Sequence, residues 1–178
     1  MSDETSVVSS SNGGGVVTGK RDRFFLGMSG AMLVILLLGF APTLYFRAFV
    51  DVQPIPFYLH LHGVVVTSWY VWVLFQASLV NIGRPEVHRR IGMAGLVIAV
   101  GVLILAPMAT LKSVPRLAAM TDFESLVVVM SWVVSQNVLI VIAFVGFVAA
   151  AICYRKQPDW HRRYMLFASM SILPPAVA

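Results

Sequence analysis

The sequence predicts an all-α, polytopic transmembrane helix bundle with four full spans and a fifth helix that is cut short. Hydrophobic residues make up 58% of the 178 residues and charged residues only 12%, whereas soluble domains carry about 25% charged residues. The apolar runs reach the length of about 20 residues that a helix needs to cross a bilayer. They also lack the two-residue alternation of a membrane β-barrel.

Four apolar runs predict the full spans. They lie at about residues 24–46, 57–80, 91–111 and 126–154. At about 1.5 Å of rise per residue, helices of these lengths cross a hydrocarbon core about 30 Å thick. Pro54 and Pro56 precede the second run and suit a helix start.

A fifth apolar segment covers residues 164–178 and is too short for a span. It has 15 residues, against the roughly 20 that a span needs. No charge or loop closes it, and Pro174 and Pro175 favour a kink. We therefore expect the sequence to be a fragment of a longer protein, with a half-span as the alternative.

The sequence predicts one transmembrane domain that is preceded by an N-terminal tail. Residues 1–19 are rich in Ser and Gly, which predicts a disordered tail before a single transmembrane domain at residues 20–178. The single cysteine, Cys153, excludes an internal disulfide framework, and no zinc pattern occurs. No metal site is predicted.

The charge distribution predicts the orientation. Ten of the 13 basic residues lie in the segments 20–23, 84–90 and 155–163, which alternating spans place on one side of the membrane. Only Arg47 and two later residues, Lys112 and Arg116, lie on the other side. Because basic residues are enriched in cytoplasmic loops, the N-terminus and both later segments are predicted to be cytoplasmic. The net charge of +5 is thereby explained by orientation and lipid headgroups, not by nucleic-acid binding.

One short motif occurs twice on this cytoplasmic side. RPEVHRR covers residues 84–90 and QPDWHRR covers residues 157–163, so that Pro, acid, any residue, His, Arg, Arg recurs after 73 residues. One interpretation is an anchor: Pro and an acid suit a helix start, and arginine side chains extend to the lipid phosphates.

The other interpretation is a ligand pair. His88 and His161 are expected at similar depth on two helices, and a neutral imidazole is a good ligand for haem iron. The arginines beside them are candidate contacts for haem propionates or for lipid phosphates. These arginines are Arg89, Arg90, Arg162 and Arg163. The sequence alone leaves both interpretations open.

Two further histidines, His60 and His62, start the second span on the opposite side. They point about 200° apart on a helix and do not share one face. His62 lines up with Trp69 and Gln76 at steps of seven residues. His60 lines up with Thr67 in a second stripe. One of the two stripes is expected to face the bundle interior, because polar groups in lipid are costly. Both histidines are weaker cofactor candidates, with bonds to loops or water as the alternative.

These motifs resemble those of a group of small, uncharacterised bacterial inner-membrane proteins. The matching residues are HLHG at 60–63, HRRIG at 88–92 and HRRYM at 161–165. The resemblance covers residues 24–178 and extends distantly to b-type cytochrome-like membrane bundles. It implies a bacterial inner-membrane location and suggests haem b as a cofactor, held by His88 and His161.

Three functional hypotheses follow. The first is a non-catalytic membrane component, structural or accessory to a membrane complex, since no acid lies inside a span and no catalytic constellation is present. The second is a redox protein that holds b-type haem between the two motifs. The third is a small transporter or lipid-handling protein. No catalytic residue is assigned, and the lipid bilayer and a membrane-complex partner are the expected partners.

Overall fold

The computed structural model describes residues 18–41, 56–119 and 122–176, and within these segments the chain is helical with short turns. The helices are α1 (Thr18–Phe40), α2 (Phe57–Asn81), α3 (Pro85–Ile91), α4 (Ala94–Ala118), α5 (Phe123–Cys153) and α6 (Pro158–Ser171), followed by the 3-10 turn η3 (Pro174–Ala176). The predicted disordered tail, residues 1–19, lies outside the described residues except for Thr18 and Gly19, which belong to α1.

Four helices are long and apolar enough to cross a membrane, as the sequence predicts. The candidate spans are Arg23–Phe40, Phe57–Asn81, Ala94–Pro115 and Phe123–Cys153. Many of their large apolar side chains are exposed on the outside of the bundle, which in a membrane is the surface that contacts lipid. The chain is therefore an all-α, multi-pass membrane protein.

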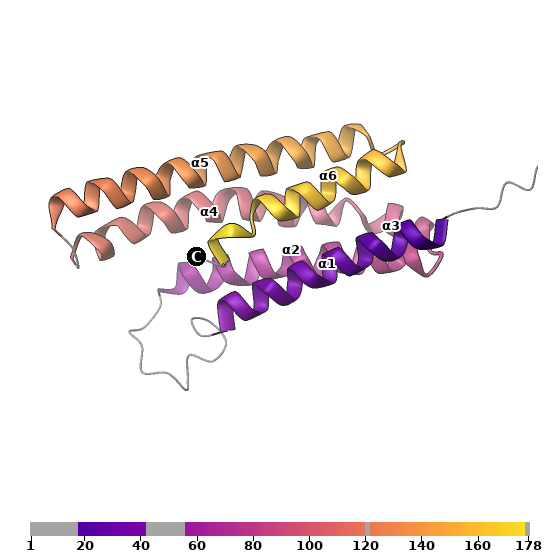
Figure 1. Ribbon diagram of the computed structural model, residues 1–178, viewed down its shortest axis with the longest axis horizontal. Helices are drawn as coiled ribbons and strands as arrows, with labels where there is room; N and C mark the ends of the chain where they lie inside the picture. The colour runs from indigo at the N-terminus through magenta and orange to yellow at the C-terminus, as the bar shows by residue number, and fades with distance from the viewer. Residues whose placement is uncertain (1–17, 42–55, 120–121, 177–178) are drawn as a thin grey trace, which may run out of the picture.

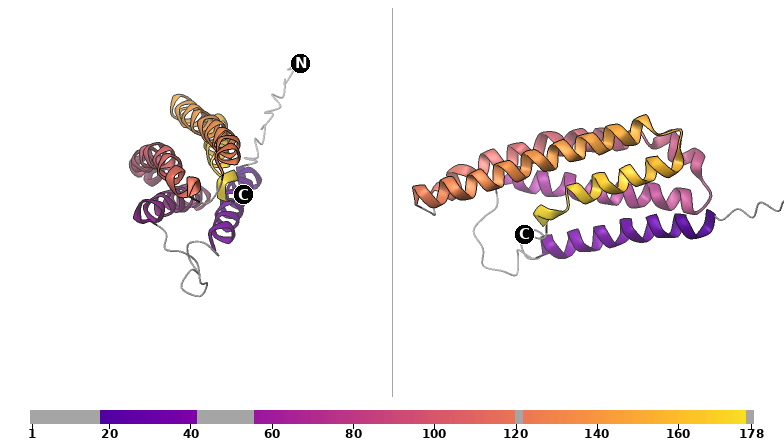
Figure 2. Two further views of the ribbon diagram at one scale, coloured as in Figure 1. Left: turned by 90° about the vertical axis from the view of Figure 1, so that its left-hand side faces the viewer. Right: turned by 45° about the horizontal axis from the view of Figure 1, so that its top comes forward.

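The short helix α6 lies among the long ones. It runs beside α5 and reaches toward α1 and α2 (Figures 1 and 2). Ala168 and Ser169 of α6 are completely buried, and Trp69 and Tyr70 of α2 are buried to 1% exposure against them. Trp69 also packs edge-on against Phe144 of α5, with the ring centres 5.0 Å apart. This helix therefore fills the centre of the bundle.

Two side-chain donors of α2 form hydrogen bonds to Ser169 of α6. The Tyr70 hydroxyl donates to the Ser169 carbonyl at 2.7 Å, and the Trp69 indole nitrogen donates to the Ser169 hydroxyl at 3.2 Å. The first of these bonds involves the backbone and the second the side chain of the same residue. Because all three groups are buried, each bond satisfies a polar group that would otherwise be costly in an apolar interior.

The basic segments gather at one end of the bundle. The start of α1, the helix α3 and the turn between α5 and α6 lie together, and we call this the basic end (Figure 1). The start of α2 lies at the opposite end. The structure thus groups the three segments that the charge pattern predicts on one side, although it does not itself assign that side.

The structure corrects two predicted helix starts. The predicted third span, residues 91–111, begins later: the first motif and Ile91 form the separate helix α3, and a turn at Gly92 and Met93 separates α3 from α4. There the amides of Gly95 and Leu96 bond three residues back, to Gly92 and Met93, instead of four. The fifth helix begins earlier than the predicted segment 164–178, because Pro158 at its first position and Asp159 in its first turn suit a helix start.

Candidate functional site

The first motif is positioned by the way in which α2 ends. Gly83 has a φ of 76°, a conformation that favours glycine, and its amide bonds to the Val80 carbonyl. The Arg84 amide bonds five residues back, to Leu79, at 2.8 Å. These two bonds form a Schellman motif, which stops α2 and satisfies its last carbonyls. Pro85 then starts α3 with its fixed φ, so that the chain turns at once into the next helix.

The second motif begins in an equivalent way. Gln157 is extended and caps α6, and Pro158 occupies the first turn. The amide of each motif histidine bonds four residues back to the capping residue: His88 to Arg84 at 3.3 Å and His161 to Gln157 at 3.0 Å. The shared motif therefore places both histidines at the same position relative to the start of their helices.

The two motif histidines face each other. The ring centres of His88 and His161 are 6.0 Å apart and the ring planes are inclined by 78°. Nδ1 of His161 lies 2.8 Å from the carbonyl oxygen of Ala151 in α5, which acts as its acceptor when that nitrogen carries the proton. We call His88, His161 and the Ala151 carbonyl the histidine junction, which connects α3, α5 and α6 at the basic end.

The electrostatics of the junction favour neutral histidine on α3. Burial lowers the pKa of His88, and the nearby His161 charge lowers it further. The Gln76 backbone raises this pKa by less than either, and the Arg89 charge lowers it by a still smaller amount. Nδ1 of His88 is buried, and the described residues offer it no hydrogen-bond partner. The side-chain amide of Gln76 is likewise buried without a partner among the described residues. At the junction itself, Nδ1 of His88 is therefore a buried polar atom that is left without a partner among the described residues.

The arginines of the two motifs differ in their surroundings. Arg162 forms an ion pair with Asp159, and its guanidinium lies over the Phe25 ring of α1, 5.0 Å from the centre. Arg163 lies over the Trp160 ring at 5.4 Å. Arg89 and Arg90 are exposed on α3. The second motif is therefore built into the packing of α1 and α6, whereas the arginines of the first motif point to the surface.

His60 and His62 are not part of this site. They lie at the start of α2, at the end of the bundle away from α3 (Figure 1). Nδ1 of His60 is 3.4 Å from the carbonyl oxygen of Pro56, four residues back, which fits the expected local bonding. His62 lies on the stripe with Trp69 and Gln76, and this stripe faces the bundle interior, where Gln76 is 8% exposed.

The spacing of the two rings matches one requirement of a shared metal ion. Metal-bound imidazole nitrogens lie about 2 Å from a metal ion, so that two rings on opposite sides of it have centres about 6 Å apart. The 6.0 Å between His88 and His161 agrees with this value. The cavity between α1 and α6, however, is lined by neither histidine.

Sequence reasoning missed two features of this end of the bundle. One is the contact between the start of α1 and the start of α6, where Phe25 meets Arg162. The other is the aromatic cluster of Tyr154, Trp160 and Tyr164, in which the Trp160 and Tyr164 rings stack at 5.9 Å. Aromatic residues next to basic ones are typical of a membrane interface, so the composition of residues 154–164 carried a signal for the cluster.

Comparison with known proteins identifies no relative. No family model, no curated protein and no solved structure matches the chain. The resemblance to small bacterial inner-membrane proteins therefore stays a prediction.

Proposed function

We propose that the protein is a non-catalytic integral membrane component of a bacterial inner membrane, structural or accessory to a larger membrane assembly. The observation that carries this proposal is the histidine junction, in which the two repeated motifs meet and connect three helices through His88, His161 and the Ala151 carbonyl. Side chains engaged in this way hold helix ends together, which supports a structural role for both motifs.

The arginines of the second motif support the same role. Arg162 reaches both Asp159 and the Phe25 ring, and Arg163 lies against Trp160. Such contacts pack the aliphatic stems on apolar surface and keep the charged groups near the headgroups. The start of α6 is thereby fixed to α1 at the basic end.

A lipid-exposed polar stretch on α5 supports an accessory role. All buried side chains of α5 lie in its second half, from Phe144 onward. In its first half Ser131 and Ser135 are exposed and lie on one face, four residues apart. Small and hydroxyl side chains in a span are typical of surfaces where another membrane helix packs. A helix of a partner would cover this face.

The charge bias supports a cytoplasmic N-terminus. Ten of 13 basic residues lie in the segments that form the basic end, and such segments are cytoplasmic in most bacterial membrane proteins. The histidine junction would then lie at the cytoplasmic surface of the membrane.

A stability and absorption experiment tests the proposal. We expect the purified protein to be colourless, both oxidised and after reduction with dithionite, even when haem is supplied during expression. We expect His161→Ala to lower the thermal midpoint by about 2–4 °C, since it removes one hydrogen bond worth about 1 kcal/mol in a chain of this size. His60→Ala, at the opposite end, is the control and should change the midpoint less. An unchanged midpoint in His161→Ala would contradict the structural role.

The second candidate function is electron transfer through b-type haem. It is favoured by the facing rings of His88 and His161, and by the Ala151 carbonyl, which holds Nδ1 of His161 and leaves Nε2 for a metal. Haem would supply one-electron redox chemistry, and Arg89 and Arg90 would be the candidate propionate contacts. The packing of the rings edge to face counts against it, since the two rings contact each other where a porphyrin would have to lie.

The two candidates differ in the same spectrum. A Soret band with sharp reduced α and β bands would overturn the first proposal and support the second. In that case His88→Ala and His161→Ala should each abolish the bands, whereas His60→Ala should retain them. Haem retained in both junction variants would exclude His88 and His161 as the ligand pair.

A further inference from the structure

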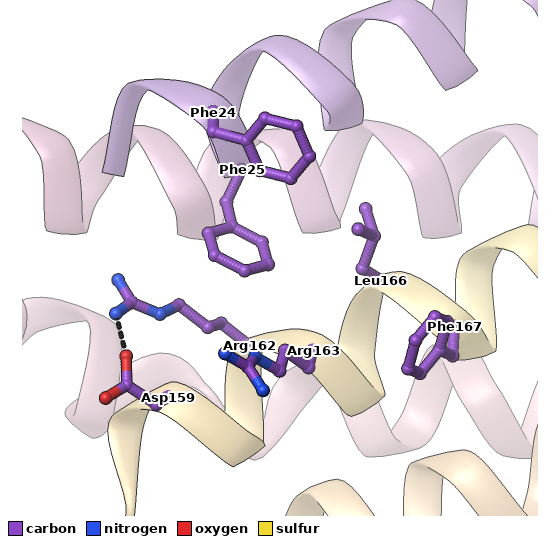
Figure 3. A pocket seen from close by; sticks show the side chains of 7 residues that line it. All are labelled: Phe24, Phe25, Asp159, Arg162, Arg163, Leu166 and Phe167. Carbon is purple, nitrogen blue, oxygen red and sulfur yellow. Dashed lines mark hydrogen bonds and ion pairs between the residues drawn. The ribbon is translucent and has the colours of Figure 1, made fainter. Parts of the chain in front are cut away.

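A cavity of about 500 Å³ lies between the start of α1 and the start of α6, and we call it the α1–α6 cleft (Figure 3). Its apolar lining consists of Phe24, Phe25, Leu166 and Phe167. Asp159 and the two motif arginines, Arg162 and Arg163, complete it. Figure 3 shows the charged side chains toward the start of α6, Leu166 and Phe167 farther along it, and Phe24 and Phe25 on α1 opposite the arginines. The cleft is therefore apolar along its length and basic at one end.

The position of the cleft matches the boundary between headgroups and hydrocarbon. The candidate span of α1 begins at Arg23, one residue before Phe24. Phe24 is 57% exposed and Phe167 is 45% exposed, so the apolar lining is open to the surface of the bundle. At this depth the surface of the bundle faces lipid, and the ligand that can enter sideways is a component of the bilayer.

The charges of the cleft select the headgroup. Two guanidinium groups and one carboxylate line it, which leaves one net positive charge at the mouth. The carboxylate of Asp159 is engaged with Arg162. Arg163, which is exposed and lies over the Trp160 ring, adds a guanidinium that is pre-oriented by this stacking. A phosphodiester with one net negative charge complements such a mouth.

We propose that the α1–α6 cleft holds one anionic phospholipid of the surrounding bilayer. The phosphate lies at Arg163, and one acyl chain lies along Phe24, Phe25, Leu166 and Phe167. Phe25 is held in place by the guanidinium of Arg162, 5.0 Å from its ring centre, so the apolar wall is formed before the lipid arrives. The lipid would fill the cleft between α1 and α6 and would connect the two helices, independently of the histidine junction.

Native mass spectrometry of the full chain tests this proposal. The protein is purified into detergent with equal amounts of phosphatidylglycerol and phosphatidylcholine, and the lipids retained per chain are counted. We expect one phosphatidylglycerol per wild-type chain, retained several-fold over phosphatidylcholine. Arg163→Gln should reduce this preference about fivefold, the contribution of one basic side chain near anionic lipid. Arg163→Lys should retain most of it.

Lys156→Gln is the matched control, because it removes one positive charge from the same end of the bundle, in the turn outside the cleft. Its preference should equal that of the wild type. Equal retention of both lipids by the wild type would overturn the proposal, as would an equal loss in Lys156→Gln and Arg163→Gln, which would indicate a diffuse surface charge.

Two further measurements separate the parts of the site. Phe167→Ser should weaken retention of both lipids, because it removes part of the apolar wall. Glycerol phosphate, which carries the anionic group without acyl chains, should not displace the lipid at millimolar concentration. Displacement by glycerol phosphate would show a site for small anions and overturn the assignment to a lipid. A thermal midpoint measured for each variant shows that it is folded.

Discussion

At the scale of single residues, burial decides how much a polar side chain contributes. Two tyrosines of α2 donate a hydroxyl proton to a backbone carbonyl of another helix: Tyr70 to Ser169 at 2.7 Å and Tyr58 to Lys112 at 3.0 Å. The bond of Tyr70 is buried, whereas that of Tyr58 is exposed. Water can replace the partner only at the exposed site, so the two bonds have unequal effects on stability.

We therefore predict that Tyr70→Phe destabilises the protein more than Tyr58→Phe does. Loss of the Tyr70 hydroxyl leaves the buried Ser169 carbonyl without this donor, at a cost of about 1–3 kcal/mol. Loss of the Tyr58 hydroxyl should change the unfolding free energy by less than about 1 kcal/mol, since water takes its place. Unfolding curves of both variants in detergent measure the difference. Equal effects would mean that Ser169 is hydrated in the bundle.

His88 predicts a dependence of stability on pH. Burial and the neighbouring His161 and Arg89 lower its pKa in the folded chain below the value of 6.5 that it has when unfolded. Between these two values the unfolded chain binds more protons, so stability is complete above about pH 6.5 and decreases as the pH falls toward the folded value. Thermal midpoints between pH 8 and pH 5 measure this decrease.

The variant His88→Asn should flatten that pH profile, since asparagine does not titrate. The matched control is His60→Asn, which replaces a histidine at the opposite end of the bundle and should leave the profile as in the wild type. A wild-type profile that stays flat down to pH 5, or one unchanged in His88→Asn, would show that His88 titrates normally in the folded chain.

At the scale of helices, the start of α5 is set by one side chain. Asp122 is extended, and its carboxylate accepts a hydrogen bond from the Ser125 amide at 2.8 Å, which lowers the pKa of Asp122. This is the usual cap of a helix N-terminus. Glu124, in the first turn, places a second negative charge near the positive end of the helix dipole. This favourable charge interaction does not depend on a capping hydrogen bond.

We predict that Asp122→Ala increases hydrogen exchange at the amides of the first turn of α5, above all at Ser125. Asp122→Asn should retain most of the protection, because asparagine is also a good cap. Glu124→Gln is the control and should change exchange little. Protection at Ser125 that is equal in the alanine variant and the wild type would show that the helix start is held by packing and not by the cap.

Hydropathy and helix-start signals predicted most of the helices, and the exceptions have physical causes. The spans were predictable because a segment that crosses the lipid must be a long apolar helix, whichever helices pack beside it. The separation of α3 from α4 was not, because Gly92 and Met93 keep helical dihedral angles and only their hydrogen bonds shift from four residues back to three. Such a small change in backbone hydrogen bonding does not alter the hydrophobicity pattern of the sequence.

At the scale of the whole molecule, the sequence predicted which segments share one end of the bundle but not which helices contact each other. Positive charges and alternating spans placed His88 and His161 at one end, and the structure shows the two rings 6.0 Å apart. The two rings face each other, and Phe25 contacts Arg162, because α6 lies among the long helices. Lateral order in a bundle comes from tertiary packing, which no local pattern of one sequence reports.

The arrangement of the bundle makes a final prediction about topology. A reporter that is active only after export is fused after Arg90, after Ser113 and after Lys156. The fusions at Arg90 and Lys156 should be inactive, because both positions belong to the basic end and basic segments stay in the cytoplasm. The fusion at Ser113, near the far end of α4, should be active.

Each outcome of these fusions bears on a different part of the proposal. Activity at both Arg90 and Lys156, with none at Ser113, would invert the orientation but keep the two motifs on one side. Opposite results at Arg90 and Lys156 would separate His88 from His161 by the thickness of the membrane. The histidine junction could then not exist in the cell, and both functions proposed for it would fall together. The α1–α6 cleft would fall with them if Lys156 gave the unexpected result, because the start of α6 would then lie across the membrane from the start of α1. If Arg90 gave the unexpected result, the cleft, which does not involve α3, would remain to be tested by lipid retention.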